Sequence, residues 1–178
     1  MKGFLIGLIL GFLILPLAGI YYFKFGNPPV AVGDKPFPLE REMVHAPLHA
    51  RIAREMPKTV PMQPTPDNLL AGAQIYRQNC AACHGLYNST SVFAQHMYPW
   101  APQLWHVEGG ADRVVGVSDD PPGETYWKVS NGIRLTGMPA FGQVLTPTEI
   151  WQVSLLLANA DKPQPQPVMD ILSKPLVY

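Results

Sequence analysis

Three features that mark other protein classes are scarce in this 178-residue sequence. There is no basic stripe: the net charge is zero, and residues 67–161 contain 4 Lys and Arg against 8 Asp and Glu, which argues against a nucleic-acid binder. No segment alternates polar and apolar residues with a period of two, so strands are expected to be minor and the fold all-α. There are two cysteines, so a structural zinc site would need two further ligands.

One long apolar run lies near the beginning of the sequence. No residue from Gly3 to Phe23 is charged, and this run would form a helix of about 31 Å, enough to cross a bilayer. A cleaved signal peptide is the alternative, but its apolar region is usually about 7–15 residues long and ends at a small-x-small site. Tyr21 and Tyr22 stand where an interfacial aromatic belt would lie. We therefore expect an uncleaved transmembrane anchor at residues 1–25.

Proline is abundant after this run. The segment from Asn27 to Pro66 contains nine prolines, which predicts a spacer over residues 26–66 that has no core of its own. Within it, PLHARIAREMPK can form one short helix that ends at Pro57. Its apolar face would carry Leu48, Ile52 and Met56. His45 and His49 flank this helix, and solvated side chains or a docking surface are more ordinary roles for them than metal ligation.

Both cysteines occur within four residues, in the sequence CAACH, and His84 follows Cys83 directly. A redox pair of the thioredoxin type needs a βαβ context, and a zinc site needs further ligands. C-x-x-C-H is the attachment pattern of haem c, in which each thiol forms a thioether and the histidine lies beneath the iron. The motif favours one covalent haem c, held by Cys80 and Cys83 and ligated by His84.

Three segments around this motif have helix-forming patterns. The segment PDNLLAGAQIYRQN, residues 66–79, is expected to form a helix that begins after an Asp or Asn cap. This helix would place Leu69, Ala73 and Tyr76 on one face. Residues 124–130 are expected to follow an Asp119 or Asp120 cap and to end at Asn131-Gly132. The sequence Thr-Pro-Thr-Glu at 146–149 has the form of a capping box, and the apolar residues after it predict a third helix.

A haem bound by one histidine leaves a sixth coordination position open. The segment NGIRLTGMPAFG places Met138 between a glycine and a proline, which predicts a loop from which the side chain reaches the other haem face. Core packing is the alternative for any methionine. Met97, His96 and His106 are weaker alternatives as the ligand.

Four motifs in this order resemble a class I, mono-haem cytochrome c over residues 67–161: GAQIYRQNCAACHG, APQL, NGIRLTGMPAFG and the helix that contains IWQVSLLLAN. The resemblance implies a cytochrome c fold, with three or four helices around one covalent haem. It implies that the carbonyl of Pro102 accepts a hydrogen bond from the second ring nitrogen of the haem histidine, and that Gly72 and Tyr76 pack against Trp151.

The chain departs from the small members of that family in two places. His84 lies eighteen residues before Pro102, and VEGGADRVVGVSDDPPGE forms an enlarged loop before the third helix. These departures leave the propionate contacts open. The candidates for them are Arg134, Trp105, Trp127 and Tyr126.

The resemblance implies an electron carrier and not an enzyme, because two axial ligands leave the iron no position for a substrate. Bacteria attach haem c on the outer face of the inner membrane, so we expect a periplasmic domain on a single-pass anchor. It would pass electrons between membrane-bound or periplasmic redox proteins of a respiratory or photosynthetic chain. The alternatives are a fixed subunit of a multi-subunit membrane oxidoreductase and a haem enzyme or sensor with a labile sixth ligand.

From Lys162 the sequence KPQPQPVMDILSKPLVY predicts a polyproline-like C-terminal tail, residues 162–178. A disordered end is the simpler expectation. The alternative is that an apolar cluster in the tail docks on a partner or on the domain itself. This cluster consists of Ile171, Leu172, Leu176 and Val177.

Overall fold

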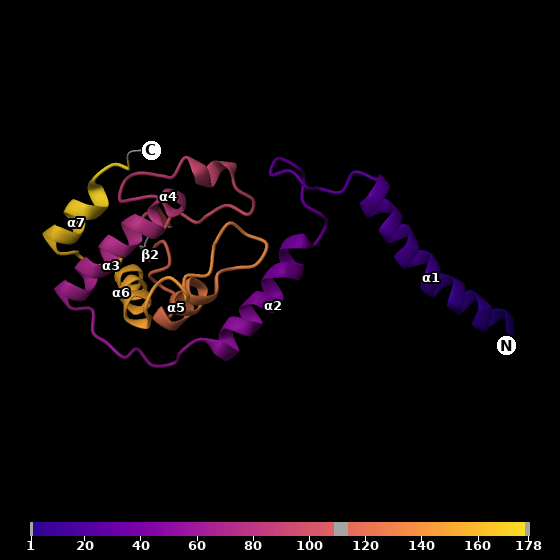
Figure 1. The fold of residues 1–178 in the computed structure, drawn as a ribbon, viewed down its shortest axis with the longest axis horizontal. Coiled ribbons are helices and arrows are strands. Elements are labelled where there is room, and N and C mark those ends of the chain that lie inside the picture. Colours follow the sequence, from indigo (N-terminus) through magenta and orange to yellow (C-terminus); the bar gives the residue numbers. More distant parts are fainter. Residues whose placement is uncertain (1, 109–113, 177–178) are drawn as a thin grey trace. The chain divides into compact units, whose positions relative to one another are not determined.

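The structure is a computed structural model that describes residues 2–108 and 114–176. It divides into two compact units, residues 1–40 and 41–178, and each is considered by itself. Regular structure in the described residues is helical apart from one two-stranded sheet, which confirms the all-α prediction. Figure 1 shows the elements in chain order.

The first unit is dominated by α1, Lys2–Phe25, which contains Pro16. The stretch Gly7–Phe25 is long and apolar enough to cross a membrane, and the large apolar side chains described there are exposed to solvent. After the helix the chain turns back, because Phe37 lies with its ring centroid 6.3 Å from that of Tyr22.

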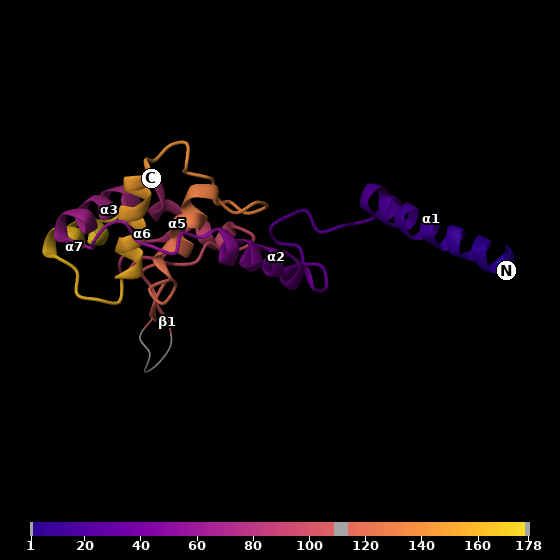
Figure 2. The same cartoon turned by 90° about the horizontal axis from the view of Figure 1, so that it is seen from below.

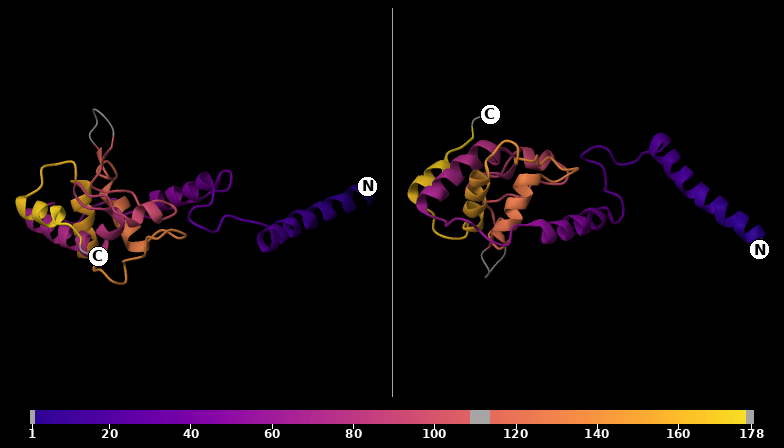
Figure 3. Two further views of the ribbon diagram at one scale, coloured as in Figure 1. Left: turned by 90° about the horizontal axis from the view of Figure 1, so that it is seen from above. Right: turned by 60° about the horizontal axis from the view of Figure 1, so that its bottom comes forward.

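The core of the second unit is built by α3, Pro66–Asn79, and α6, Pro147–Ala158, with α5, Pro122–Asn131, packed on α6. Gly72 lets α3 and α6 approach closely, since a Cβ there would lie 2.4 Å from the carbonyl oxygen of Gln152. Tyr76 and Leu156 are fully buried in the resulting core. The two further views in Figure 3 show these helices side by side.

The helix caps agree with the sequence in one case and differ in two. Thr146 and Glu149 form the expected capping box of α6. The cap of α3 is Thr65, and not an Asp or Asn, because Pro66 takes the first helical position and the Thr65 hydroxyl accepts from the Asn68 N–H. Pro121 precedes α5 without a side-chain cap, so the prediction of an aspartate cap there was wrong.

The aromatic contacts of the core also differ from the expected ones. Gly72 packs against α6 as expected, but it contacts the backbone at Gln152 and not the Trp151 side chain. Tyr76 makes an edge contact with Trp105, with ring centroids 6.0 Å apart. Trp151 instead stacks on Tyr126, with centroids 4.3 Å apart. Trp105, which directly follows the APQL motif, takes the position facing Tyr76, and Trp151 pairs with Tyr126 of α5.

Short elements connect the core helices. They are α4, Ala81–His84, the 3-10 helix η1, Phe93–His96, and the antiparallel strands β1, Val107–Glu108, and β2, Val114–Val115. The strands project from the helices (Figure 2). Residues 109–113 of the enlarged loop lie outside the described residues.

Two proline-rich segments form helices that sequence reasoning placed less well. The helix α2, Glu40–Glu55, begins earlier than the expected one and contains Pro47. In the tail, α7, Gln166–Ser173, packs on α3 and buries Val168 and Leu172 completely. The tail is thus docked on the domain itself, and Val177, expected to join this contact, lies outside the described residues.

Candidate haem site

The end of α3 brings both cysteines and the histidine into one helical turn. Cys80 follows α3 directly, and its N–H donates to the carbonyl of Tyr76 at 2.8 Å. The carbonyl of Cys80 then accepts from the N–H groups of Cys83, at 3.1 Å, and His84, at 2.9 Å. Both thiols are free. This geometry presents two thiols and an imidazole from the five consecutive positions 80–84, which comprise Cys80 and the four residues of α4.

Gly85 ends the turn in a conformation that favours glycine. Its φ is +73°, and a Cβ there would lie 2.5 Å from the side-chain oxygen of Gln103 and 2.7 Å from the carbonyl of Ser89. The chain therefore leaves α4 sharply and brings Gln103 against it.

The His84 ring is oriented by one hydrogen bond. Its Nδ1 lies 2.7 Å from the carbonyl oxygen of Pro102, and because a carbonyl only accepts, Nδ1 carries the proton and Nε2 keeps its lone pair. Burial lowers the pKa of His84, and the bond to Pro102 offsets part of this. The ring is therefore held neutral with one nitrogen available as a metal ligand.

The side chain of Gln103 joins three segments around α4. Its amide nitrogen donates to the carbonyls of Cys83, at 3.1 Å, and Ala101, at 3.0 Å, and its oxygen accepts from the Ser91 N–H at 2.7 Å. Ser91 in turn donates through its hydroxyl to the carbonyl of Ala82. Sequence reasoning missed both residues, although Gln103 stands next to Pro102 in the APQL motif.

Two buried aromatic side chains lie behind the turn. The Tyr76 hydroxyl donates to the carbonyls of Gly85, at 2.8 Å, and His84, at 3.1 Å, and burial raises the pKa of Tyr76 well above its ordinary value. Burial, with a smaller contribution from Cys83, also raises the pKa of Cys80 to about 12. The Nε1 of Trp105 is buried and makes no hydrogen bond of ordinary geometry among the described residues, but it lies toward the Tyr76 hydroxyl, and this interaction opposes part of the rise in the pKa of Tyr76.

The loop that carries Met138 is folded onto the last turn of α5. The carbonyl of Met138 accepts from the Ile133 N–H at 3.2 Å, and the Met138 N–H donates to the Thr136 hydroxyl at 3.1 Å. Gly132, with φ +64°, lies so close that a Cβ would be 2.8 Å from the Met138 carbonyl. The Met138 side chain is partly buried and packs against the same core as Cys80.

The other residues predicted as alternative iron ligands or as propionate contacts lie in different parts of the domain. Met97 touches the methionine loop, because a Cβ at Gly137 would lie 2.2 Å from its terminal carbon. His96 and His106 are exposed, as is Arg134. Of the aromatic candidates, Tyr126 stacks on Trp151 and Trp127 donates to Glu55. Trp105 is the aromatic candidate whose indole N–H is buried behind the turn.

These residues fit a covalent haem c. Two thiols one turn apart and an imidazole with its second nitrogen already bonded match the thioethers and the histidine ligand of that group. Among residues 2–108 and 114–176, no three His, Cys, Asp or Glu side chains come together as a metal site. The zinc alternative therefore finds no additional ligands in this part of the chain.

Comparison with known proteins agrees with this chemistry. Residues 67–155, half of the chain, match the family model described as cytochrome C oxidase, cbb3-type, subunit III. Neither curated proteins nor solved structures gave a match. The matched region runs from the start of α3 into α6 and contains the CAACH turn and the Met138 loop. The chain therefore belongs to this family of c-type cytochrome domains, and its cofactor is a covalently bound haem c.

Proposed function

We propose that the protein carries single electrons at the periplasmic face of the bacterial inner membrane, on a haem c with His84 and Met138 as axial ligands. Its partners would be redox proteins of a respiratory or photosynthetic chain. The observation that carries the proposal is the 2.7 Å contact between His84 Nδ1 and the Pro102 carbonyl. A ring bonded in this way presents Nε2 as a basic ligand in a fixed orientation.

The bound haem supplies one-electron redox chemistry. Cys80 and Cys83 would anchor it covalently. With His84 on one side and Met138 on the other, the iron keeps no position for a substrate, which favours transfer over catalysis. A thioether ligand raises the reduction potential relative to a second imidazole.

The N-terminal segment supports attachment to a membrane. The stretch Gly7–Phe25 is long enough to span a bilayer, and a tethered domain meets membrane-bound partners at a raised effective concentration. Lys24 lies in the last turn of α1, at the end that leads to the haem unit.

A fixed subunit of a membrane oxidoreductase is the second candidate. The printed description of the matching family, an oxidase subunit, favours it. The apolar cluster of the C-terminal tail does not favour a fixed subunit, because it is already packed within its own domain. The helix α7 packs on α3, and the Arg77 guanidinium donates to the carbonyls of Ile171, Lys174 and Pro175. The tail is thus occupied within its own domain. Purification in mild detergent separates the candidates, because a fixed subunit brings stoichiometric partners and a carrier does not.

Replacement of the axial methionine tests the proposed ligation. In the full-length haem protein, Met138→His should abolish the near-infrared methionine–iron band. It should also lower the reduction potential by on the order of 0.2 V, within the range of about 0.8 V that axial ligands set. Met43→Leu, at a methionine of α2 that is 72% exposed, is the matched control and should change neither. An unchanged potential and spectrum in Met138→His would remove Met138 from the ligand set.

A further inference from the structure

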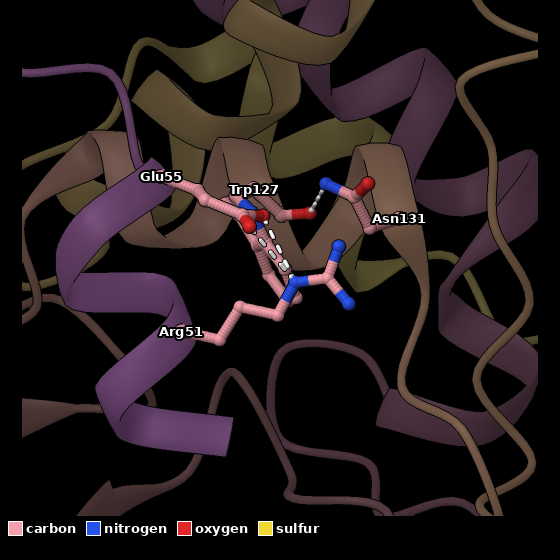
Figure 4. Close-up of polar contacts among 4 residues, drawn as sticks. All are labelled: Arg51, Glu55, Trp127 and Asn131. Atoms are coloured by element: carbon pink, nitrogen blue, oxygen red, sulfur yellow. Dashed lines mark hydrogen bonds and ion pairs between the residues drawn. The ribbon is translucent and has the colours of Figure 1, made fainter. Parts of the chain in front are cut away.

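The C-terminal end of α2 is docked on α5 through a closed group of three side chains (Figure 4). The Trp127 indole N–H donates to the Glu55 carboxylate at 3.0 Å. Arg51 Nε donates to both oxygens of the same carboxylate, at 2.9 and 3.1 Å, and the Arg51 guanidinium carbon lies 5.9 Å from the centroid of the Trp127 ring. We call Arg51, Glu55 and Trp127 the dock.

Burial and backbone contact extend the dock beyond these side chains. Ile52, between Arg51 and Glu55, is 2% exposed, and Trp127 is 7% exposed. A Cβ at Gly123 would lie 2.0 Å from the carbonyl oxygen of Pro57, so the chain after α2 runs directly over the first turn of α5. A free spacer helix would leave an isoleucine in water. The end of α2 is therefore packed as part of the domain.

The other end of α5 supports the methionine loop. The carbonyls of Val129 and Ser130 accept from the N–H groups of Phe141, at 2.9 Å, and Gly142, at 3.0 Å. The Asn131 side chain donates to the carbonyl of Trp127 at 2.9 Å and links the dock to the last turn. This ten-residue helix thus lies between the dock and the loop. A helix this short is marginal without tertiary contacts.

We infer that α2 is a positioning element for the axial methionine: α2 docks on Trp127, and Pro57 after it covers Gly123, so together they hold α5. The helix α5 in turn holds the loop that carries Met138. This inference rests on the proposed ligation by Met138. Without the dock, α5 keeps only its packing on α6, including the stack of Tyr126 on Trp151. The base of the loop is then held less firmly, so the methionine would leave the iron more readily. Covalent attachment through Cys80 and Cys83 would be unaffected, since Cys80 lies at the junction of α3 and α4 and Cys83 lies on α4.

Two substitutions open the dock in different ways. Gly123→Ala removes no side chain and favours helix formation, but its Cβ would collide with the Pro57 carbonyl. Trp127→Phe keeps an aromatic ring and removes the N–H that Glu55 accepts. Gly33→Ala is the matched glycine control, because its Cβ meets nothing within 4 Å. Glu55→Gln is the conservative variant, because the amide oxygen can still accept from Trp127.

The measurement is a pH titration of the near-infrared methionine–iron band in the full-length oxidised protein. Raising the pH supplies competing ligands, namely deprotonated side chains and hydroxide. Gly123→Ala and Trp127→Phe should lose the band at a pH about one unit lower than the parent, a tenfold shift in the equilibrium between bound and released methionine. The pH at which Gly33→Ala loses the band should match that of the parent. The pH for Glu55→Gln should lie closer to the parent's than the pH for Trp127→Phe does.

Trypsin cleavage after Arg51 and Arg54 reports separately whether the dock has opened. Faster cleavage with an unchanged pH midpoint in both dock variants would overturn the inference and leave ligation by Met138 intact. A parent protein without the band at any pH would overturn the inference together with the proposed ligation. If Gly123→Ala fails to accumulate, Trp127→Phe carries the test alone.

Discussion

At the scale of single residues, the site depends on hydrogen bonds that fix backbone and ring positions around α4. Pro102 holds the His84 ring, and the Tyr76 hydroxyl binds the carbonyls that end the turn. Gln103 binds Cys83, Ala101 and Ser91 at once. These bonds join segments that lie far apart in the sequence, so the position of each thiol depends on the folding of the whole domain.

Gln103 provides the test at this scale. Gln103→Ala leaves the Ser91 N–H and the Cys83 carbonyl without their partner, which should lower the free energy of unfolding by about 1–3 kcal/mol. Denaturant unfolding of the haem protein measures this loss of stability. Gln95→Ala, at an exposed position of η1, is the control and should leave the stability unchanged. Equal stability of the two variants would show that water replaces the amide without cost.

The sequence predicted those residues whose role is set by a local pattern. CAACH and the segment around Met138 are short and contiguous, so the thiols and the two ligand candidates could be named before the fold was known. Gln103 and Ser91 act through bonds across twelve residues of loop, and no pattern marks such pairs. The contact of Tyr76 with Trp105 was missed for the same reason, because the two residues lie 29 positions apart and no local pattern pairs them.

At the scale of elements, α6 shows how a local signal specifies a helix. The Glu149 carboxylate accepts from the Thr146 N–H and hydroxyl, both at 2.7 Å. These bonds hold the pKa of Glu149 below its ordinary value of 4.5. Because the folded pKa is the lower one, the contribution to stability is fully present above the ordinary value and is lost as the pH falls through the folded pKa.

Glu149→Gln tests this dependence on pH. The amide can still accept a hydrogen bond but does not titrate, so between pH 4.5 and the lower folded pKa the variant should lose less stability than the parent. Urea unfolding midpoints at several pH values measure the difference, and Glu42→Gln on α2 is the control. Parallel pH profiles of parent and Glu149→Gln would contradict the assignment.

The helices α2 and α7 mark the limit of prediction for elements. Their proline-rich surroundings indicate extended chain. The sequence nevertheless predicted a short helix with an apolar face in the spacer and named docking of the tail on the domain as an alternative, but it gave no partner for either contact. What orders α7 is its burial on α3 and the capping of its C-terminal carbonyls by Arg77. What orders the end of α2 is Trp127 of α5. Both contacts are tertiary, so they could be found only in the structure.

At the scale of the whole molecule, docking of α2 changes the length of the free tether. The sequence indicated a spacer from 26 to 66, whereas α1 ends at Phe25 and α2 begins at Glu40. We propose that the tether is residues 26–39, of which Phe37 packs back on Tyr22 and Phe23. Even fully extended, these residues reach at most about 50 Å.

Limited proteolysis of the full-length protein in detergent tests the tether. Elastase, which cuts after small aliphatic residues, should cleave first around Val30–Val32, where Val30 is 88% exposed. It should release a haem fragment that retains α2. The alanines of α2, including Ala50 and Ala53, are internal controls. Cleavage at these alanines as fast as at Val30 would show that the spacer is free over its full length.

The central claim is that one haem is bonded to this chain through Cys80 and Cys83. Mass spectrometry of the denatured protein, after maturation in a host that attaches haem c, tests it most directly. The expected mass is that of the polypeptide plus one haem, with the added mass on the peptide that contains CAACH. The mass of the polypeptide alone would contradict it.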